Sequence, residues 1–370
     1  MRILILNWRD LASARGGGAE RVTHEIARRL VERGHEVTWL SSKEPGRPAE
    51  EAVDGVAIVR RGGELTTHLH GPWIARRGFD VVVDAINTVP YLAPLWSRVP
   101  VIVFFHQLAR DVWWYEAPQP LAAVGWVAEP LYLQAYRRTP AVTVSASTRD
   151  DLRRFGLRER IDVIPLAVSG SPNPRADAPK ALTGRLIAVG RLTPSKRVDH
   201  AIAALAELRR THPEARLDVI GTGAERGRLE REVAAHGLDG HVAFHGRVSD
   251  EERDRLLAEA DAVVGTSVRE GWGLTVTEAA LAGTPAVVYD IPGFRDSVID
   301  GRTGIVTRPN PRALADGVRR LLEDPEAYAR VREASRGRAR GLDWTATTNA
   351  FELALEAAVR RRAVGRAPRR

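Results

Sequence analysis

The chain has 370 residues, enough for two ordinary domains, and carries a formal net charge of +8. With 44% apolar and 28% charged residues, it has the composition of a globular protein and not of a disordered chain. It contains no cysteine, which excludes disulfides and thiolate metal sites and fits a reducing, cytoplasmic compartment. The first apolar run is too short for a signal peptide and no window approaches about 20 apolar residues, so we expect no membrane span.

The excess positive charge is concentrated at the C-terminus. The segment from Val359 to Arg370 holds six arginines and no acid, and the rest of the chain has 49 basic and 47 acidic residues, a net of +2. This balance argues against a nucleic-acid-binding protein. The arginines are typical of a solvated chain end, and contact with the anionic inner face of a membrane stays open as the alternative.

Apolar, β-rich runs alternate with helical patterns in the first 168 residues. The helical pattern at 19–33 has apolar residues at Val22, Ile26 and Leu30 and ends at Gly34. Most of the other runs are continuously apolar, as expected of parallel strands that are covered on both faces. These runs lie at residues 2–8, 36–42, 56–60, 80–85, 101–106, 141–147 and 161–165. We therefore predict a doubly wound, Rossmann-like domain over residues 1–168.

The segment 169–184 is rich in Pro, Gly, Ser and Ala and is interpreted as an interdomain linker. The alternation then restarts and predicts a second doubly wound domain over 185–342. Its strands are expected at 185–190, 216–221, 241–246, 261–267, 285–290 and 303–307, and its helices at 195–211, 224–236, 249–259, 275–282 and 311–323. The remaining residues, 343–370, predict a helix from Trp344 to Arg362 and the basic tail, and whether this helix packs back on the first domain stays open.

Polar residues follow several predicted strands, at the edge where ligands of doubly wound sheets bind. Gly16, Gly17 and Gly18 connect the first strand to its helix, which suits either close approach to an anion or a simple tight turn. Arg191 follows the strand at 185–190, and Lys196 lies at the start of the next helix, where two cations suit a diphosphate.

The stretch REGWGLTVTEAALAG, from Arg269 to Gly283, holds two carboxylates eight positions apart. Glu270 lies in the loop that follows a predicted strand, and Glu278 lies about one turn inside the next helix. The glycines between them expose backbone N–H groups toward the same place. A ligand with both hydroxyls and phosphate would use all of these groups, whereas either glutamate alone would be taken as a solvated or dipole-stabilising residue.

These motifs together resemble the retaining glycosyltransferases of family 4. The resemblance depends on Gly190-Arg191, Lys196 and the E-x7-E motif of Glu270 and Glu278, and it extends from Met1 to about Arg340. It implies the GT-B fold, with two facing Rossmann-like domains and the nucleotide-sugar donor mostly in the second one. It also implies a hexosyltransferase-type reaction from a UDP- or GDP-linked sugar to an acceptor hydroxyl, with retention of anomeric configuration and no cofactor.

The resemblance assigns a role to each motif residue. Arg191 and Lys196 would bind the donor diphosphate, Glu278 the ribose hydroxyls and Glu270 the transferred sugar. His106 would touch the sugar from the end of its strand, although a lone histidine is more often structural. The remaining donor contacts would be backbone or loop contacts, made by Gly17, Gly18, Arg247, Val248, Gly271, Trp272, Gly273, Leu274 and Thr275. Because the cations and amides stabilise the leaving diphosphate, and no convincing D-x-D loop is present, we expect a metal-independent enzyme.

The acceptor is expected to meet the first domain. The segment 107–138 is rich in tryptophan and tyrosine, which stack on sugars, lie at membrane interfaces or pack in a core. A glycan, a lipid-linked molecule and a small molecule are all compatible acceptors. Two rival functions also remain: a nucleotide-sugar-binding protein without turnover, and another GT-B enzyme such as a nucleotide-sugar epimerase.

Overall fold

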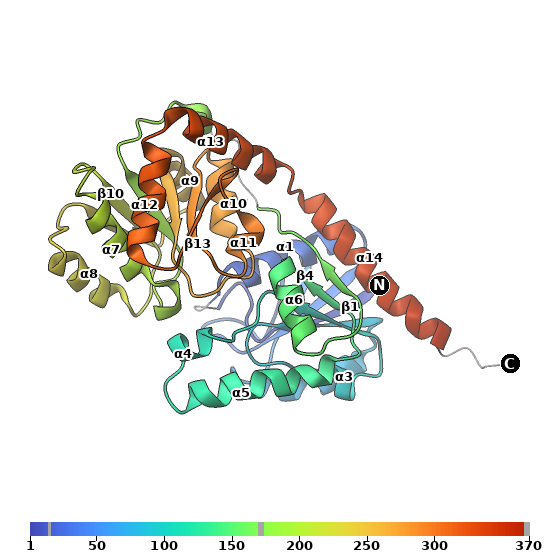
Figure 1. Cartoon of the computed structure of the whole chain (residues 1–370). Helices are drawn as coiled ribbons and strands as arrows, with labels where there is room; N and C mark the ends of the chain where they lie inside the picture. Colours follow the sequence, from blue (N-terminus) through green and yellow to red (C-terminus); the bar gives the residue numbers. More distant parts are fainter. Residues whose placement is uncertain (14–15, 169–173, 366–370) are drawn as a thin grey trace. The chain divides into compact units, whose positions relative to one another are not determined.

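The computed structural model describes residues 1–13, 16–168 and 174–365, with side chains as far as residue 361. The chain divides into two compact units. Unit 1 comprises Met1–Arg110, Ala123–Leu166 and Trp344–Arg370, and unit 2 comprises Asp111–Ala122 and Ala167–Asp343. Each unit is a layered α/β structure built around its own sheet (Figure 1).

In its described residues, unit 1 has an eight-stranded sheet of order β3-β4-β2-β1-β5-β6-β7-β8. All neighbours pair in parallel except β3 and β4, which are antiparallel at the edge. The strands are β1 (Arg2–Leu6), β2 (Glu36–Ser41), β3 (Glu50–Val53), β4 (Val56–Arg60), β5 (Val81–Ile86), β6 (Val101–Phe105), β7 (Ala141–Thr143) and β8 (Ile161–Val163). The central strands are continuously buried, as the apolar runs predicted.

The helices around this sheet begin with α1 (Gly18–Glu32), which covers β2 with its apolar stripe. The others are α2 (Gly71–Ile74), α3 (Ala93–Trp96), α5 (Leu121–Leu133), α6 (Ala146–Arg154) and α14 (Trp344–Gly365), with short 3-10 turns at η1 (Thr66–His70), η2 (Ala75–Arg77) and η3 (Gln134–Tyr136).

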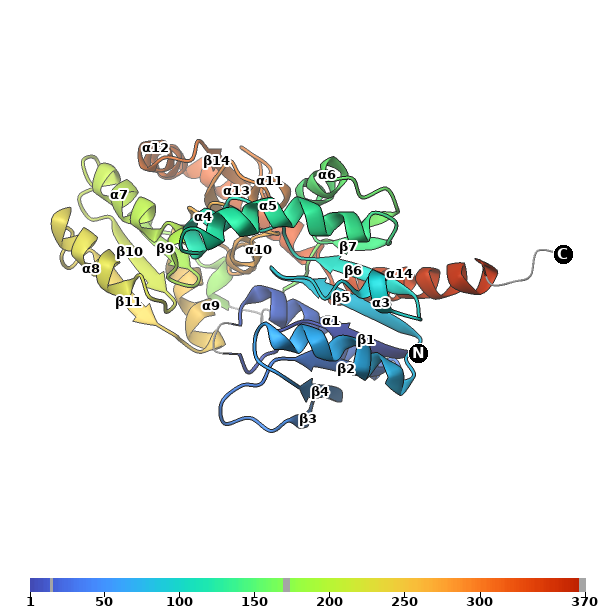
Figure 2. The ribbon, with the colours of Figure 1, turned by 90° about the horizontal axis from the view of Figure 1, so that it is seen from below.

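Helix α14, the last of the chain, packs on unit 1. It contacts α1 and lies along β5 and β6 (Figure 2). Phe351 meets Phe104 edge-on, with 5.2 Å between ring centroids, and both side chains are fully buried. Glu352 accepts hydrogen bonds from Arg33 (2.6 Å) and His35 (2.8 Å) at the end of α1. The core of unit 1 is therefore closed by a segment that follows all of unit 2 in the sequence.

Unit 2 has a six-stranded, fully parallel sheet of order β11-β10-β9-β12-β13-β14 in its described residues. Its strands are β9 (Arg185–Val189), β10 (Arg216–Ile220), β11 (Val242–Gly246), β12 (Ala262–Gly265), β13 (Ala286–Tyr289) and β14 (Gly304–Thr307). Its helices are α4 (Val112–Glu116), α7 (Val198–Leu208), α8 (Arg226–Ala235), α9 (Asp250–Glu259), α10 (Leu274–Leu281), α11 (Phe294–Ser297), α12 (Pro311–Leu322) and α13 (Pro325–Arg340), with turns η4 (Pro174–Asp177) and η5 (Pro194–Lys196).

The prediction of two doubly wound parallel sheets is confirmed, but two elements were not predicted and one predicted strand is shorter than expected. Strand β3 was not predicted, because its sequence EEAV is short and carries charge on an exposed edge. Helix α13 was also not predicted, because few apolar residues lie on its buried face. The run at 141–147 ends as a strand at Thr143, since Ser145 caps α6 by accepting the Thr148 N–H (3.2 Å).

The segment Asp111–Ala122 differs from the predicted boundaries, which placed residues 1–168 in one domain. Its contacts assign it to unit 2, where α4 packs on η5. Glu116 accepts a hydrogen bond from the Ser195 N–H (3.3 Å) and another from the Ser195 hydroxyl. A polar tie of this kind has no local sequence signal, because its two ends lie 79 residues apart.

Candidate functional site

Each sheet has one point where its strand order reverses, and ligands of doubly wound folds bind at the carboxyl ends of the strands there. In unit 1 this point lies between β1 and β5, and in unit 2 it lies between β9 and β12. Most predicted donor-binding residues follow β9 and β12. The strand order of unit 2 thus brings residues from about 190 and about 270 to one edge of the sheet.

The backbone at the start of the loop after β9 lies very close to the backbone at the end of β10. Gly221, at the end of β10, has φ +137°, and a Cβ atom there would lie 1.8 Å from the Gly190 carbonyl oxygen. Any side chain at Gly221 would therefore displace the start of the loop. Arg191 comes next and is exposed, and its guanidinium makes no ion pair within the described residues. The loop thus presents a cation at the reversal point.

Lys196 and Glu270 contact each other across the reversal point. Lys196 ends η5, and its ammonium donates a hydrogen bond to Glu270 Oε1. The Ser267 hydroxyl donates to the same oxygen at 2.6 Å. Both members of the pair are partly buried, with side chains 25% and 18% exposed. Ser267 was not among the predicted site residues, although its position three residues before Glu270 in the same loop was an available signal.

Arg197 links the loop that carries Lys196 to the loop that carries Glu270. Its backbone is left-handed (φ +47°), and its guanidinium donates to the carbonyls of Thr266 (2.9 Å) and Ser267 (3.0 Å). The Val268 N–H in turn donates to the Ser195 carbonyl (2.8 Å). Because both loops are fixed by backbone hydrogen bonds, Lys196 and Glu270 are held on a rigid support.

Helix α10 begins at the same edge, and its N-cap is Gly273 (φ +85°). A Cβ at Gly273 would lie 2.8 Å from the Phe294 ring, so glycine is required by both backbone and space. No described side chain caps this helix start. Its first N–H groups and the positive end of its dipole therefore suit an anionic ligand.

The other predicted residues of this segment divide into inward and outward ones. The Trp272 indole is buried and donates to the Thr277 hydroxyl (3.0 Å), so only its backbone faces the edge. The Thr275 hydroxyl lies 3.5 Å from the Val189 carbonyl and links α10 to β9. Gly271 and Leu274 are partly exposed.

Glu278 lies in the second turn of α10, and Arg253 of α9 lies 3.6 Å from its Oε1. Arg253 was not singled out from the sequence, because charged residues are frequent in surface helices. Arg247 and Val248 lie in the loop between β11 and α9, where Arg247 is exposed and Val248 packs on the core. Both residues thus follow a strand at the same edge as the other candidates.

The glycine loop of unit 1 differs from its predicted use. Glu20, one turn into α1, folds back and accepts the Gly17 N–H at 2.6 Å. Its other oxygen accepts from Asn87 (2.7 Å) and pairs with Arg9 (3.0 Å). The Gly17 amide is therefore occupied by the protein's own carboxylate, whereas Gly18 is exposed. Residues 14 and 15 of this loop lie outside the described residues.

His106 follows β6 and is buried beside α1. Its Nε2 lies 3.0 Å from the Thr23 hydroxyl, which itself donates to the Ala19 carbonyl (2.9 Å). Since that hydroxyl has only one proton, Nε2 must carry the imidazole proton and donate. Burial, with a smaller effect from the charge of Arg9, lowers the pKa of His106 to about 3. The imidazole is therefore neutral at physiological pH and is no general acid there.

The aromatic segment 107–138 is divided between core and surface. Tyr136 is fully buried, and its hydroxyl donates to Asp84. Trp126 of α5 is 38% exposed and stacks with Arg110, whose guanidinium carbon lies 4.6 Å from the ring. Trp114 and Tyr115 of α4 are also exposed. The core alternative therefore holds for Tyr136, whereas Trp114, Tyr115 and Trp126 lie at the surface.

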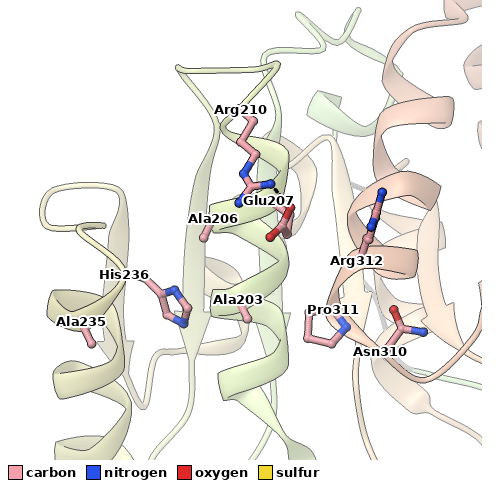
Figure 3. A pocket seen from close by; sticks show the side chains of 9 residues that line it. All are labelled: Ala203, Ala206, Glu207, Arg210, Ala235, His236, Asn310, Pro311 and Arg312. Atoms are coloured by element: carbon pink, nitrogen blue, oxygen red, sulfur yellow. Dashed lines mark ion pairs between the residues drawn. The ribbon is translucent and has the colours of Figure 1, made fainter.

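A separate hollow of about 660 Å³ lies on unit 2, between α7, α8 and the start of α12 (Figure 3). Arg210 and Glu207 pair with each other at its rim (3.1 Å). None of the predicted site residues lines it. Among the side chains that the structure describes, no group of three or more His, Cys, Asp or Glu is placed to hold a metal ion. No helix in the described part of the chain is long and apolar enough to cross a bilayer.

Two parallel α/β units, with polar loops at the carboxyl edge where the strand order reverses, define a two-domain protein of Rossmann-like architecture. Two family models match it: Glycosyltransferase Family 4 over residues 16–171 and Glycosyl transferases group 1 over residues 178–338. The chain is 30% identical to glycogen synthase of Mycobacterium tuberculosis, over 95% of this chain and 93% of the relative. It therefore belongs to glycosyltransferase family 4, and the resemblance seen in the sequence is confirmed.

Further relatives and solved structures agree with this assignment. A D-inositol 3-phosphate glycosyltransferase of Kineococcus radiotolerans is 28% identical, over 95% of this chain and 92% of the relative. Sucrose-phosphate synthase from Thermosynechococcus elongatus superposes with a TM-score of 0.79 at 21% identity, over 99% of this chain and 100% of that one. Anabaena Alr3699/HepE, solved in complex with UDP-glucose, gives 0.76 at 20% identity, over 96% and 100%. These structures establish the GT-B fold.

Proposed function

We propose that the protein transfers a hexosyl unit from a nucleoside-diphosphate sugar, UDP- or GDP-linked, to an acceptor hydroxyl, with retention of anomeric configuration. The observation that carries this proposal is the edge between β9 and β12. There an arginine, a lysine bonded to a glutamate and the start of a helix follow neighbouring strands, and within the described residues the arginine has no ion pair and the helix start no side-chain cap. Cations and amides suit a diphosphate, and the carboxylates suit the hydroxyls of a sugar and a ribose.

The residues take the following roles in this proposal. Arg191, Lys196 and the first N–H groups of α10 stabilise the negative charge that grows on the leaving diphosphate. Glu270 accepts hydrogen bonds from the transferred sugar, and Glu278 accepts them from the ribose. The loop at Arg247 and Val248 lies toward the base. His106, which is neutral, acts as a hydrogen-bonding group toward the sugar and not as a proton donor to it.

Without donor, Lys196 and Glu270 neutralise each other's charge. A diphosphate offers Lys196 two anionic groups, and a sugar offers Glu270 neutral hydroxyl donors. Donor binding therefore replaces one charge-assisted hydrogen bond by others of the same kind, so neither residue is left unpaired. Because protein cations take the place of a metal at the diphosphate, the reaction is proposed to be metal-independent.

The test begins with binding. We expect UDP or GDP to bind the wild type, and Lys196→Ala and Glu278→Ala to weaken that binding on the order of 10²-fold without loss of folding. Arg210→Ala is the matched control, since Arg210 is an exposed cation of the same unit that lies at the separate hollow. Unchanged affinity in both site variants would refute the site assignment.

Turnover separates this function from its rivals. The donor sugar is incubated with acceptor in the presence of EDTA, and the glycosidic product is examined by NMR. A glycoside with the donor's anomeric configuration supports the proposal. Isomerised nucleotide sugar would indicate an epimerase, and tight binding without any released nucleotide would indicate a non-catalytic binding protein. An absolute requirement for a divalent ion would contradict metal independence.

One surface feature favours a lipid-linked acceptor over a soluble glycan or small molecule. Val124, Val127 and Leu131 lie along one stripe of α5 and are 59%, 55% and 67% exposed. Such a stripe suits peripheral contact with a membrane from the cytoplasmic side. We expect the protein to sediment with anionic vesicles, and Val127→Asp to reduce this more than Leu353→Asp, which changes an exposed leucine on α14. Equal sedimentation of both variants would contradict this role of α5.

A further inference from the structure

We infer that Arg253 is a positioning residue that holds the carboxylate of Glu278 toward the ribose of the donor nucleotide. The inference rests on the proposed function, because Glu278 is assigned to the ribose there. It starts from the 3.6 Å between Arg253 Nη1 and Glu278 Oε1. Both side chains are largely shielded from water, being 10% and 17% exposed, so their charges interact strongly.

The hydrogen bonds of Arg253 go elsewhere. Its guanidinium donates to Asp250 (2.7 Å) and to Asp254 (2.7 and 2.9 Å), which belong to the same helix, α9. The two aspartates thus fix the guanidinium on its own helix. Toward Glu278 the distance exceeds that of a hydrogen bond, so Arg253 attracts the carboxylate without using one of its lone pairs.

This geometry suits a carboxylate that has to bind a diol. An ionised carboxylate accepts one hydrogen bond from each of two neighbouring hydroxyls, whereas a protonated or rotated one does not. A cation at 3.6 Å attracts the carboxylate and favours one orientation of it.

A purely structural role, tying α9 to α10, explains less. Helix α9 is already anchored in the core by Leu256 and Leu257, which are almost fully buried. Arg253 lies one turn after Ser249, the N-cap of α9, which directly follows Arg247 and Val248. It therefore stands at the edge of the sheet where the nucleotide is proposed to bind.

The experiment compares two ligands that differ only in the ribose diol. Dissociation constants of UDP and 2′,3′-dideoxy-UDP, and of the corresponding GDP pair, are measured by calorimetry on the full chain. The readout is the dissociation constant of the dideoxy analogue divided by that of the parent nucleotide, for the base that binds more tightly. A structural defect weakens both ligands alike, whereas loss of diol recognition lowers the ratio.

We expect Arg253→Gln to lower this ratio about tenfold, through weaker UDP or GDP binding with the dideoxy analogue unchanged. Arg253→Gln combined with Glu278→Gln should lower it no further than Glu278→Gln alone. Arg255→Gln is the matched control, because Arg255 lies two residues along α9 and pairs with Glu252 and Glu259 at the surface. It should leave the ratio at the wild-type value.

Asp254→Ala tests the same inference should Arg253→Gln not fold. It removes an anchor of the guanidinium, which then closes on Glu278 and lowers the ratio. An unchanged ratio in a folded Arg253→Gln or Asp254→Ala protein, with a lowered ratio in Glu278→Gln, overturns the role of Arg253 and leaves the proposed function standing. A wild type that binds both members of each pair equally overturns the ribose assignment itself, and this inference with it.

Discussion

The buried imidazole of His106 predicts a specific loss of stability in acid. Its pKa is lowered to about 3 in the folded protein, mainly by burial, whereas an unfolded histidine titrates near 6.5. A group with a depressed folded pKa stabilises the protein above its unfolded pKa, and this stability is lost as the pH falls through 6.5 toward 3. At pH 5 the unfolded imidazole is almost fully protonated while the folded one is still neutral. The linkage relation then gives a loss of about 2 kcal/mol between pH 7 and pH 5.

The wild-type pH profile alone cannot show this effect, because Asp84 acts in the opposite direction. Burial raises the pKa of Asp84 to about 6, so its stabilising contribution increases as the pH falls from 7 to 5. The comparison is therefore between the wild type and His106→Gln, which shares Asp84 but has no titrating group beside Thr23. Free energies of unfolding are measured with urea at pH 7 and pH 5.

Between pH 7 and pH 5, we expect the wild type to lose about 2 kcal/mol more free energy of unfolding than His106→Gln does. Both proteins should keep the same m-value, so that the shift reports stability and not a change in the unfolded state. A difference that stays constant between the two pH values would refute the conclusion that His106 is buried in its neutral form.

Three further changes test contacts that stabilise each unit by itself. Gly221→Ala places a Cβ against the Gly190 carbonyl at 1.8 Å, and should destabilise unit 2 by about 3 kcal/mol and weaken nucleotide binding, as measured by thermal unfolding with and without UDP. Asp10→Ala removes the 2.7 Å partner of Arg60, a guanidinium with only 2% exposure, and should cost about 3 kcal/mol in urea unfolding. Removal of α14 uncovers Phe104 and should lower the midpoint of thermal unfolding and increase binding of a hydrophobic dye.

Each of these changes has a control. Gly240→Ala alters a glycine with a similar left-handed backbone but with nothing within 4 Å of the added Cβ, so its cost should stay near 1 kcal/mol. Glu44→Ala changes another acid of unit 1, one that makes no side-chain ion pair among the described residues, and should be nearly neutral. Leu353→Ala, which shortens an exposed side chain of α14, should leave thermal unfolding nearly unchanged. Equal effects of a variant and its control would contradict the corresponding argument.

The sheets could be predicted from the sequence because parallel strands covered on both faces need continuous apolar runs. Short apolar runs such as VVVDAI at β5 and RLIAV at β9 are typical of strands that are buried on both faces. Strand β3 and helix α13 lack that signal. Strand β3 is a charged edge strand, and the buried face of α13 includes polar residues, Ser335 and Arg336, beside its apolar ones. Their existence depends on neighbours supplied by distant parts of the chain.

The candidate site was predicted where a residue type and a strand end coincide, as at Lys196 and Glu270. Its supporting residues were not predicted, because their importance depends on distances in space. Arg253 is one of many arginines in the sequence, and only the fold brings it to 3.6 Å from Glu278. Glu20 lies three residues after Gly17 in the sequence, but that its carboxylate occupies the Gly17 amide is a property of the folded helix start.

The two glycine-led helices illustrate why one fold carries different chemistry in its two halves. Helix α1 and helix α10 both have a glycine as N-cap, Gly17 and Gly273. Each helix follows a strand that lies next to the point where the strand order of its sheet reverses. In α1 the third residue is Glu20, whose carboxylate accepts the Gly17 N–H and also pairs with Arg9, so this amide is not available to an anion. In α10 the third residue is Val276, so the helix start keeps its amides and its positive dipole. An acid at that single position therefore occupies an amide at the start of α1, and its absence leaves the start of α10 open to the diphosphate that we propose.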